Sequence, residues 1–422
     1  MIHGPRAVRL AIVSLGLVSA GSWAPIAAQV SNRPTPSGSA PRTSSAAPTS
    51  TTAEQASAGW TVTPSIGIAS TWDDNPTLAS DGADARVGDY VTAVRPDLAA
   101  TFRGRLTSFS LGYGGIFDFY RDRPDLNTQD HRGSLEFSRQ LTRRVSFFAR
   151  DQAVYSPTTG DLTDLVATVL RRRTTRMNSF RTGFDAAVAR HTTITAAYTT
   201  QWIAFETAEN DPSTAFLQGG HSHGGSGSLR QQISPRVAVG VDYSAQRALA
   251  GDTADLFDTH SVLAVTEVAV ARHVEATFGY GHAWLFTGDG TRRNGPAFRL
   301  GLEWHGRRAV GRVEYARAFL PSFGFGGTYQ NQELRASLHA PFGRWFTWGA
   351  GGGATDSDPL TFGTPKLRAY SAQSSLAVTV KRRLRLEAIG SHVFQDSTGA
   401  GGRVHVTRLG VQASIATPMR AR

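Results

Sequence analysis

The sequence predicts an all-β fold: a transmembrane, antiparallel, up-and-down β-barrel of about 18 strands, with 16 as the alternative count. Three observations lead to this fold class. Hydrophobic side chains alternate with small or polar ones in many segments, short basic turns recur along the chain, and longer polar loops lie between those turns. We therefore expect short turns at the periplasmic end of the barrel and longer loops at the extracellular end.

The composition of the 422-residue chain supports this fold class by exclusion. Charged residues make up 18% and glycine contributes 44 residues, which disfavours a helical bundle rich in Ala, Leu, Glu and Lys. After the N-terminal region, no run approaches the roughly 18 apolar residues that a transmembrane helix requires. Because cysteine is absent, disulfide frameworks, thiolate metal sites and cysteine catalysis are excluded. The formal charge of +11 is carried almost entirely by arginine.

Residues 1–58 precede the expected barrel. Residues 1–28 have the order of a secretory signal peptide, with Arg6 and Arg9 before an apolar stretch and small residues before Gln29. An uncleaved anchor helix is the alternative interpretation. Residues 29–58 are rich in Ser, Thr, Pro and Ala and nearly free of large apolar side chains, so we expect a disordered linker. The outer-membrane barrel is then expected over residues 59–417.

The first expected strand, 60–72, shows the alternation most clearly. Its even positions are mostly large and apolar, as at Ile66 and Ile68, whereas its odd positions carry Thr, Ser, Gly and Ala. Alternate side chains of a strand point to opposite faces, so one face is apolar and the other is small and polar. Trp60 and Trp72 would be about 28 Å apart along the membrane normal, close to the height of the apolar band of such barrels. We expect them at the two membrane interfaces.

Further segments repeat this alternation, and we expect a strand in each. They begin near Thr107, Thr193, Val274, Phe298 and Ser375. Two other segments fit poorly, because 145–155 has Asp151 in its apolar series and 220–233 is rich in glycine. We still expect strands there, since the spacing of the turns requires them.

Eight short turns rich in basic residues divide the chain at intervals of 35 to 47 residues, and two strands joined by a longer loop are expected in each interval. Eight such turns and nine longer loops connect 18 strands. A soluble β-sandwich, propeller or solenoid is the alternative, but these folds do not explain why the two sets of connections differ. The turns are centred on Gly104, Arg143, Arg190, Pro235, Arg272, Arg307, Gly343 and Arg382, and the longer loops include 73–88, 206–218, 287–295 and 354–364.

Fourteen charged residues fall at strand positions that alternate with the large apolar ones, so we expect them to face inward. A barrel of 18 strands is too wide for side chains to fill, so these residues would line an aqueous lumen. Charges of both signs would pair laterally across strands and stiffen the wall, or alternatively would form a selectivity filter. The pore-lining candidates are Arg95, Asp97, Asp118, Glu136, Arg181, Asp185, Asp242, Glu275, Arg299, Glu303, Arg312, Glu314, Arg385 and Glu387.

The third long loop, 156–177, differs from the others. From Asp161 to Leu170 its apolar residues have helical spacing, and several arginines follow. Our hypothesis is that this helix folds against the lumen wall and that the arginines narrow the pore in favour of anions. A helix lying over the outer rim is the alternative. The candidate constriction residues are Arg171, Arg172, Arg173 and Arg176.

Other chemical sites have weak support in the sequence. His221 and His223 would share a strand face but lack a third metal ligand, and Asp73-Asp74-Asn75 is more typical of a turn than of a calcium site. No nucleophile occupies a recognisable turn motif, and the arginines are not clustered with aromatic residues as in nucleic-acid-binding proteins. We therefore expect no catalytic residues, no metal, no cofactor and no nucleic-acid partner.

Short motifs near the start of the expected barrel carry a family resemblance. Thr63-Pro64-Ser65-Ile66, Asp73-Asp74-Asn75 and Arg95-Pro96-Asp97-Leu98 resemble the outer-membrane β-barrel (porin-like) proteins, a group that includes barrels linked to exopolysaccharide export. The match covers roughly residues 60–100, and the remainder agrees in strand rhythm. The resemblance implies a location in the cell outer membrane and a diffusion or export pore, and no functional residues carry over from it.

These expectations combine into one leading function and two alternatives. The leading function is a water-filled pore that passes small hydrophilic solutes or a secreted glycan without covalent chemistry. The alternatives are a non-conducting scaffold barrel in envelope or exopolysaccharide assembly and an outer-membrane enzyme that modifies lipids. The expected partners are outer-membrane lipid, the barrel-assembly machinery and components of polysaccharide export.

Overall fold

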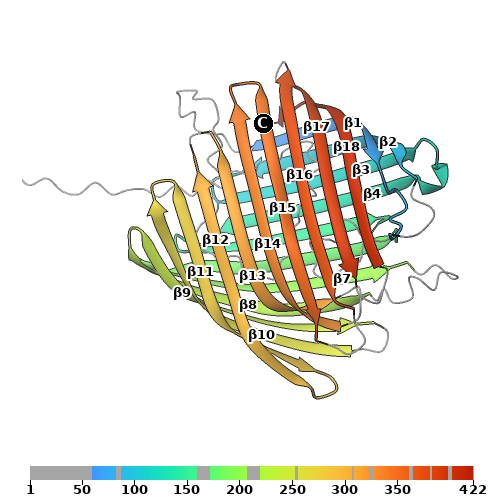
Figure 1. The fold of residues 1–422 in the computed structure, drawn as a ribbon. Coiled ribbons are helices and arrows are strands. Elements are labelled where there is room, and N and C mark those ends of the chain that lie inside the picture. The colour runs from blue at the N-terminus through green and yellow to red at the C-terminus, as the bar shows by residue number, and fades with distance from the viewer. Residues whose placement is uncertain are drawn as a thin grey trace, which may run out of the picture.

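The structure is a computed structural model that describes residues 59–81, 87–158, 172–206, 219–251, 255–306, 308–322, 327–360, 365–380, 383–397 and 402–421. Over these residues the chain forms 18 long strands and one short strand in a single antiparallel sheet, together with one short 3₁₀ helix, η1 (Figure 1). No helix among the described residues is long and apolar enough to cross a membrane. The predicted signal peptide at 1–28 and linker at 29–58 lie outside the described residues.

The strands follow one another along the chain, and η1 is the one helix between them among the described residues. They are β1 (Gly59–Asp73), β2 (Asp89–Arg103), β3 (Thr107–Tyr120), η1 (Pro124–Leu126), β4 (Thr128–Gln140), β5 (Val145–Ser156), β6 (Thr175–Ala189), β7 (Thr192–Phe205), β8 (Gly220–Ser234), β9 (Val237–Ala250), β10 (Asp255–Ala271), β11 (Val274–Thr287), β12 (Arg292–His305), β13 (Val310–Ser322), β14 (Gly327–Phe342), β15 (Phe346–Pro359), β16 (Leu367–Val380), β17 (Leu384–Ser397), β18 (Gly402–Ala416) and β19 (Met419–Ala421).

The sheet closes on itself, as the prediction of an up-and-down barrel requires. Each strand from β1 to β18 pairs with the next one in the chain, and β18 pairs back with β1 from Ser65↔Ala416 to Asp73↔Arg408. The short strand β19 continues this pairing along β1, from Val62↔Met419 to Trp60↔Ala421. The pairing thus extends past residue 417, where the barrel was expected to end. Closure pairs every long strand with a neighbour on both sides, apart from the loop-end halves of β12 and β13. The strand count is 18 and not 16.

The two ends of the barrel differ in their connections, as predicted. All eight short basic turns join neighbouring strands at one end and span two to four residues. At the other end the connections span four to eighteen residues. The three longest are 74–88, 157–174 and 206–219. The turn end is therefore periplasmic and the loop end extracellular.

Two loops are shorter in the structure than the sequence predicted. The loop expected at 287–295 is reduced to 288–291, because β12 already begins at Arg292. The loop expected at 354–364 begins only after Pro359, because β15 continues through Thr355 and Ser357. The glycine-rich and polar residues of β15 remain extended because β14 and β16 pair with them on both sides and satisfy their backbone groups.

The two segments with poor alternation are strands in the structure. In β5, Asp151 lies opposite Leu135 and Phe180 and therefore faces outward. Its carboxylate accepts a hydrogen bond of 3.1 Å from the Asn178 amide, which gives this lipid-facing acid one polar partner. The glycine-rich β8 pairs along its length with β7 and β9. Neighbouring strands thus override weak local strand preference.

The pairing register separates an apolar outer face from a polar inner face. On β1, Ile66 and Ile68 are exposed on the outer face, whereas Ala69 and Thr71 are buried on the inner face. Toward the turn end, the outer face of other strands carries residues such as Leu302 and Val411, which are also exposed. Trp60 and Trp72 stand at opposite ends of the outer face of β1. A closed barrel with such an apolar outer band spans a membrane, and the cell outer membrane is its location.

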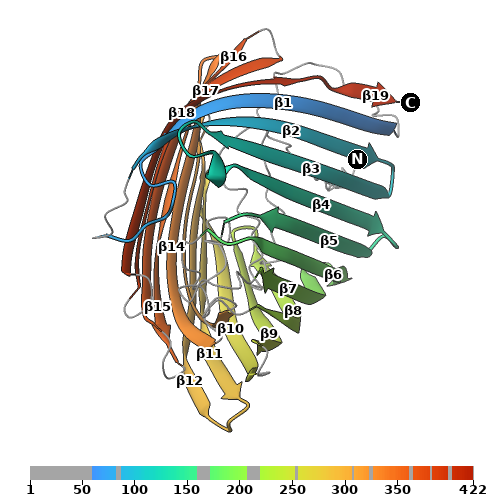
Figure 2. The same cartoon turned by 90° about the vertical axis from the view of Figure 1, so that its right-hand side faces the viewer.

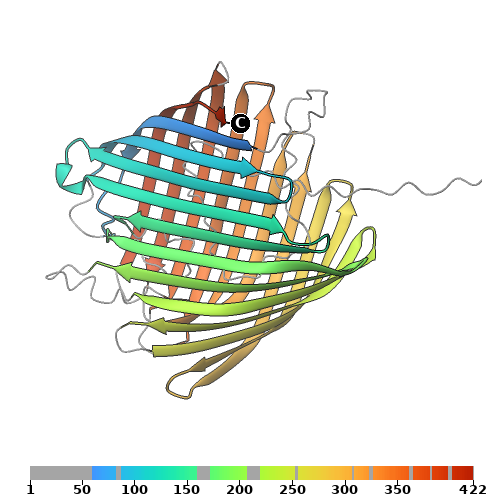
Figure 3. The ribbon, with the colours of Figure 1, turned by 180° about the vertical axis from the view of Figure 1, so that it is seen from behind.

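The barrel is not round. Figures 1 and 3 show two walls whose strands cross at a steep angle, β1–β9 on one side and β10–β18 on the other. Figure 2 shows the sheet turning sharply around β10–β12. At this corner strands that are not neighbours come into contact, since β13 contacts both β9 and β10. The inner faces of the two walls therefore meet at the corner, whereas they diverge elsewhere.

An apolar core fills the inside of this corner. Leu263, Val265 and Leu285 point inward from β10 and β11 and are buried, and Phe257 and Ala283 belong to the same cluster. The pairing of β12 with β13 stops at Phe298↔Arg317, so the loop-end halves of these strands separate. The ring of Phe319 joins the inner cluster at this point and is only 8% exposed. The corner is thus packed like the interior of a soluble protein.

Candidate functional site

The inner wall of the barrel is the candidate functional site. The pairing register places all fourteen charged residues of the predicted set on the inner face, and it adds charged residues that the sequence analysis missed. Predicted and found inside are Arg95, Asp97, Asp118, Glu136, Arg181, Asp185, Asp242, Glu275, Arg299, Glu303, Arg312, Glu314, Arg385 and Glu387. Added by the structure are Asp130, Arg132, Arg150, Arg230, Glu267, Glu333 and Arg335.

At the seam where the barrel closes, Arg95 of β2 reaches across β1 to β18. Its guanidinium donates a hydrogen bond of 2.8 Å to the side-chain carbonyl of Gln412, and Arg95 is only 8% exposed. Gly67 lies between them on the inner face of β1, where an added Cβ would stand 3.2 Å from the Gln412 amide. Glycine at this position leaves room for the arginine. The link connects three strands across the closing seam.

At the corner, four charged residues form a network across β8, β9, β10 and β12. Arg230 donates two hydrogen bonds to the Asp242 carboxylate at 2.7 and 3.0 Å and one to Glu267 at 3.0 Å. Arg299 donates to the same Asp242 carboxylate at 2.9 Å. Asp242 is completely buried, so both guanidiniums neutralise a carboxylate that water does not reach. Arg230 was missed because β8 has almost no apolar alternation to show which of its side chains face inward, and Glu267 lies on β10, for which no alternation was assigned.

Elsewhere on the inner wall, most ion pairs join residues two positions apart on one strand. Arg132 pairs with Asp130 at 3.1 Å, and Arg385 pairs with Glu387 at 3.2 Å. Arg312 pairs with Glu314 in the same way, and so does Arg335 with Glu333. These pairs add to the lateral pairs that were expected, since residues i and i+2 share a face and long arginine side chains can turn back along the strand. Arg150 and Glu136 form a lateral pair at 3.9 Å.

Arg172 ties the third loop to the inner wall. Its guanidinium donates hydrogen bonds to the carbonyl oxygens of Pro76 at 2.9 Å and Leu126 at 3.1 Å, and to the hydroxyl of Tyr120 at 2.8 Å. The same guanidinium lies 5.0 Å from the centre of the Tyr120 ring. Tyr120 is buried on the inner face of β3, three strands away from β6. The end of the loop therefore crosses the inside of the barrel mouth.

The other members of the predicted constriction set separate. Arg173 is buried beside Arg172 in the chain. Arg176 instead faces outward from β6, where it pairs with Glu206 at 2.6 Å and lies over the ring of Tyr155. Arg171 and the predicted helix at 161–170 lie outside the described residues.

The first loop also folds inward at the mouth. Leu78 is buried against Val404 and Val406 on the inner face of β18. Asn75 holds the turn together, because its side chain accepts a hydrogen bond from the Ala79 amide and donates one to the carbonyl of His405. Asp73 pairs with Arg408 at 2.9 Å, and the Asp74 carboxylate accepts from the Thr407 amide. The Asp73-Asp74-Asn75 side chains thus serve the turn and the barrel wall.

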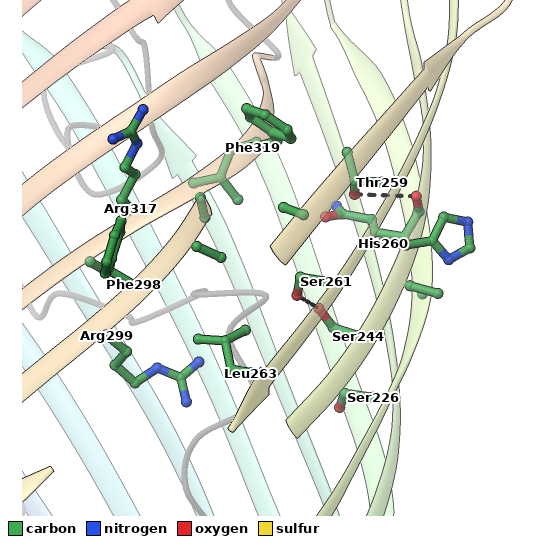
Figure 4. A pocket seen from close by; sticks show the side chains of 18 of the residues that line it. Ser226, Ser244, Thr259, His260, Ser261, Leu263, Phe298, Arg299, Arg317 and Phe319 are labelled. Carbon is green, nitrogen blue, oxygen red and sulfur yellow. Dashed lines mark hydrogen bonds between the residues drawn. The ribbon is translucent and has the colours of Figure 1, made fainter. Parts of the chain in front are cut away.

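A recess in the inner wall lies beside the apolar corner (Figure 4). Ser226, Ser244 and Ser261 line one side from three consecutive strands, and the hydroxyls of Ser244 and Ser261 are 2.7 Å apart. Arg299 and Phe319 border it on the other side. The recess therefore offers hydroxyl groups, one guanidinium and an aromatic ring to a solute in the lumen. His221 and His223 do share a strand face, as predicted, but they point outward, away from it.

Comparisons with known proteins find similarity of structure and none of sequence. No protein-family model and no curated protein matches this chain. Among solved structures, OpdO of Pseudomonas aeruginosa superposes with a TM-score of 0.44 at 11% identity, covering 86% of this chain and 98% of that one. OccAB3 of Acinetobacter baumannii gives 0.44 at 9% identity, covering 85% and 99%. The siderophore receptor PirA of Pseudomonas aeruginosa gives 0.43 at 9% identity, covering 84% and 80%. At these values, no residue role passes from those proteins to this chain.

Proposed function

We propose that this barrel is an aqueous pore for small hydrophilic solutes in the outer membrane. The observation that carries the proposal is the opposite character of the two faces: the charged residues predicted from parity all lie inside, whereas large apolar residues such as Ile66 lie outside. Lining a barrel of 18 strands with charges of both signs keeps water in the lumen. A purely structural barrel has no need of so many inward charges.

The route for solutes lies on the side of the lumen away from the corner. The apolar core of Phe257, Leu263, Val265 and Leu285 and the network around Asp242 occupy the corner itself. The wall at β4 and β5 instead presents Glu136 and Arg150, whose side chains are 62% and 58% exposed. Solutes entering from outside would first pass Arg172 and Arg173. These arginines favour anions at the mouth, in line with the constriction hypothesis.

Planar-bilayer recording tests the proposal directly. Purified protein in its full-length mature form should produce discrete open-channel steps, with a reversal potential that favours chloride over potassium under a salt gradient. Vesicles carrying the protein should swell in small sugars and amino acids but not in large dextrans. Persistent electrical silence together with no swelling would overturn the pore. Passage of long glycan chains would instead support export.

A second candidate function is a non-conducting scaffold barrel, which is favoured by the loops and the packed corner that occupy part of the lumen. Two loops fold inward through Arg172 and Leu78, and the corner is solid. A scaffold would stay silent in bilayers even after the 157–174 loop is shortened, whereas a loop-restricted pore would open. A lipid-hydrolysis assay on the same preparation tests the enzyme alternative. If hydrolysis persists in every variant with a single inner-wall substitution, the inner wall holds no catalytic residue.

A further inference from the structure

Histidine is unusually placed on the outer face of the barrel. Of the twelve histidines in the sequence, seven point outward within the described strands, and all seven lie in the loop-end half. The outer face at the turn end of the same strands is instead lined by large apolar residues such as Leu229 of β8 and Phe278 of β11. These imidazoles therefore mark the boundary between the apolar band and the outer surface. They are His131, His221, His223, His260, His282, His392 and His405.

The densest part of this boundary is on β8, β9 and β10. His223 lies opposite Arg247, which lies opposite Asp258, and His221 and His260 are each two positions away on the same face. His221, His223 and Arg247 are exposed. Arg247 holds Asp258 in a two-pronged ion pair at 2.7 and 2.8 Å, so this face carries one carboxylate against one guanidinium and three imidazoles. The cluster consequently has donors in excess of acceptors.

His260 shows how the cluster is held. Its Nδ1 is 3.0 Å from the Tyr243 hydroxyl, so only Nε2 can meet a ligand. Its ring points away from Arg299 and Phe319, which border the inner recess (Figure 4). The ring also packs edge-on against Phe286 of β11. His260 is thereby fixed on the outer face and is no part of the lumen.

A strip without side chains runs from this cluster toward the turn end. Gly225 and Gly227 follow His223 on the outer face of β8. A Cβ added at Gly225 would meet no atom within 4 Å, and one at Gly227 would meet only a backbone oxygen at 3.9 Å. Tyr198 of β7 and Tyr243 of β9, both exposed, flank the strip on its two sides. The result is a shallow groove with aromatic walls, which continues to the exposed Leu229.

We propose that this groove and cluster bind one phosphate-bearing lipid of the outer leaflet. An acyl chain lies along Gly225 and Gly227 between the two tyrosines, and the phosphate meets Arg247, His221 and His223 at the loop end. Three features support this occupant: the excess of donors matches an anion, the groove is as narrow as one strand, and the charged end stands at the level where lipid headgroups lie. The site is on the outer face, so it holds whether or not the lumen conducts.

Lipid retention by the full-length mature protein tests the proposal. The probe is lipid A, a doubly phosphorylated and multiply acylated glucosamine disaccharide, added to protein in mild detergent and measured by native mass spectrometry. The triple variant His221→Gln, His223→Gln, Arg247→Gln should retain about tenfold less lipid A, as expected from losing charged hydrogen bonds. The matched control, His392→Gln with His405→Gln on β17 and β18, should retain as much as the unaltered protein.

Two further measurements separate a lipid site from an anion site. Gly225→Leu fills the groove and leaves the charges in place, so it should lower lipid A retention while the barrel stays folded, as read by its heat-dependent gel mobility. Dephosphorylated lipid A should bind the unaltered protein as weakly as lipid A binds the triple variant. Equal loss in the His392 and His405 control, unchanged retention in Gly225→Leu, or full displacement of lipid A by millimolar inorganic phosphate would each overturn the proposal.

Discussion

The corner around β10–β13 and the seam where β18 meets β1 are built from the same kind of ladder, yet their inner faces differ. At the corner the walls converge, and Leu263, Val265 and Phe319 pack together beside a fully buried carboxylate. At the seam the walls diverge, and Arg95 reaches over Gly67 to an amide on the neighbouring edge. Curvature of the sheet, and not strand sequence alone, thus decides whether inward side chains form a core or line water.

The largest effect is expected at the corner, from Asp242→Asn. The substitution leaves Arg230 and Arg299 with a neutral partner in a site that water does not reach, which costs about 3 kcal/mol or more. Urea unfolding of the detergent-solubilised barrel should therefore shift strongly to lower concentration. Asp258→Asn is the matched control, because it breaks an ion pair of the same strand region on the outer face. Equal shifts for the two variants would contradict the buried network.

The next effect is expected from Phe319→Ala, which removes the ring that packs into the corner where β12 and β13 separate. Loss of a buried phenyl group should destabilise the barrel by about 3 kcal/mol. The measurement is the same urea unfolding, with Phe278→Ala as control, since Phe278 is exposed on the outer face of β11. If the control destabilised as much as Phe319→Ala, the corner would not be a core.

A smaller and local effect is expected at the mouth from Arg172→Ala. The variant loses hydrogen bonds to Pro76, Leu126 and Tyr120, which anchor the loop by about 1–3 kcal/mol. Single-channel conductance should rise and anion preference should fall, while global unfolding changes little. Arg176→Ala, in the same region of the chain but facing outward, should leave both channel properties unchanged. Identical behaviour of the two variants would place Arg172 outside the conduction path.

The smallest effect concerns pH at the tip of the β11–β12 hairpin. The hydroxyl of Thr287 and the amide of Thr291 donate to the Asp289 carboxylate and lower its pKa. Because this pKa is lowered, the ionised Asp289 carboxylate orders the loop fully above the ordinary aspartate pKa of about 3.9. This ordering is lost as the pH falls through the pKa of Asp289 in the folded protein. A spin label at Gly288, where an added side chain meets only ordinary contacts, should thus report constant order from pH 8 to 5 and greater motion only below about pH 4. Asp289→Asn should abolish this dependence.

Much of the fold could be predicted because the two-residue period and the turn chemistry act locally. The parity of Ile66 and Ile68 fixed the outer face of β1, and the basic turns fixed the number of strands. The ends of strands were less predictable, because Thr355 and Ser357 resemble loop residues until two neighbours pair with them. Local sequence does not reveal those neighbours.

The candidate site was predictable in its orientation and not in its contacts. Parity placed Asp242 and Arg299 inside, but their contact spans β9 to β12 and depends on the sharp turn of the sheet. Likewise, Arg172 and Arg176 look alike in sequence, and only the fold sends one to Tyr120 and the other to Glu206. Contacts between distant strands arise from global shape, which no short window of residues encodes.

Pairing of β1 with both β18 and β19 has a consequence for biogenesis. The ladder joins the first strand to the final two, from Trp60↔Ala421 to Asp73↔Arg408. Until those last residues emerge, the opening strand has bare amides and carbonyls along one side, and hydrocarbon tolerates none of them. The wall of the barrel is therefore complete only once β18 and β19 have paired with β1, so closure is the last step that the ladder allows.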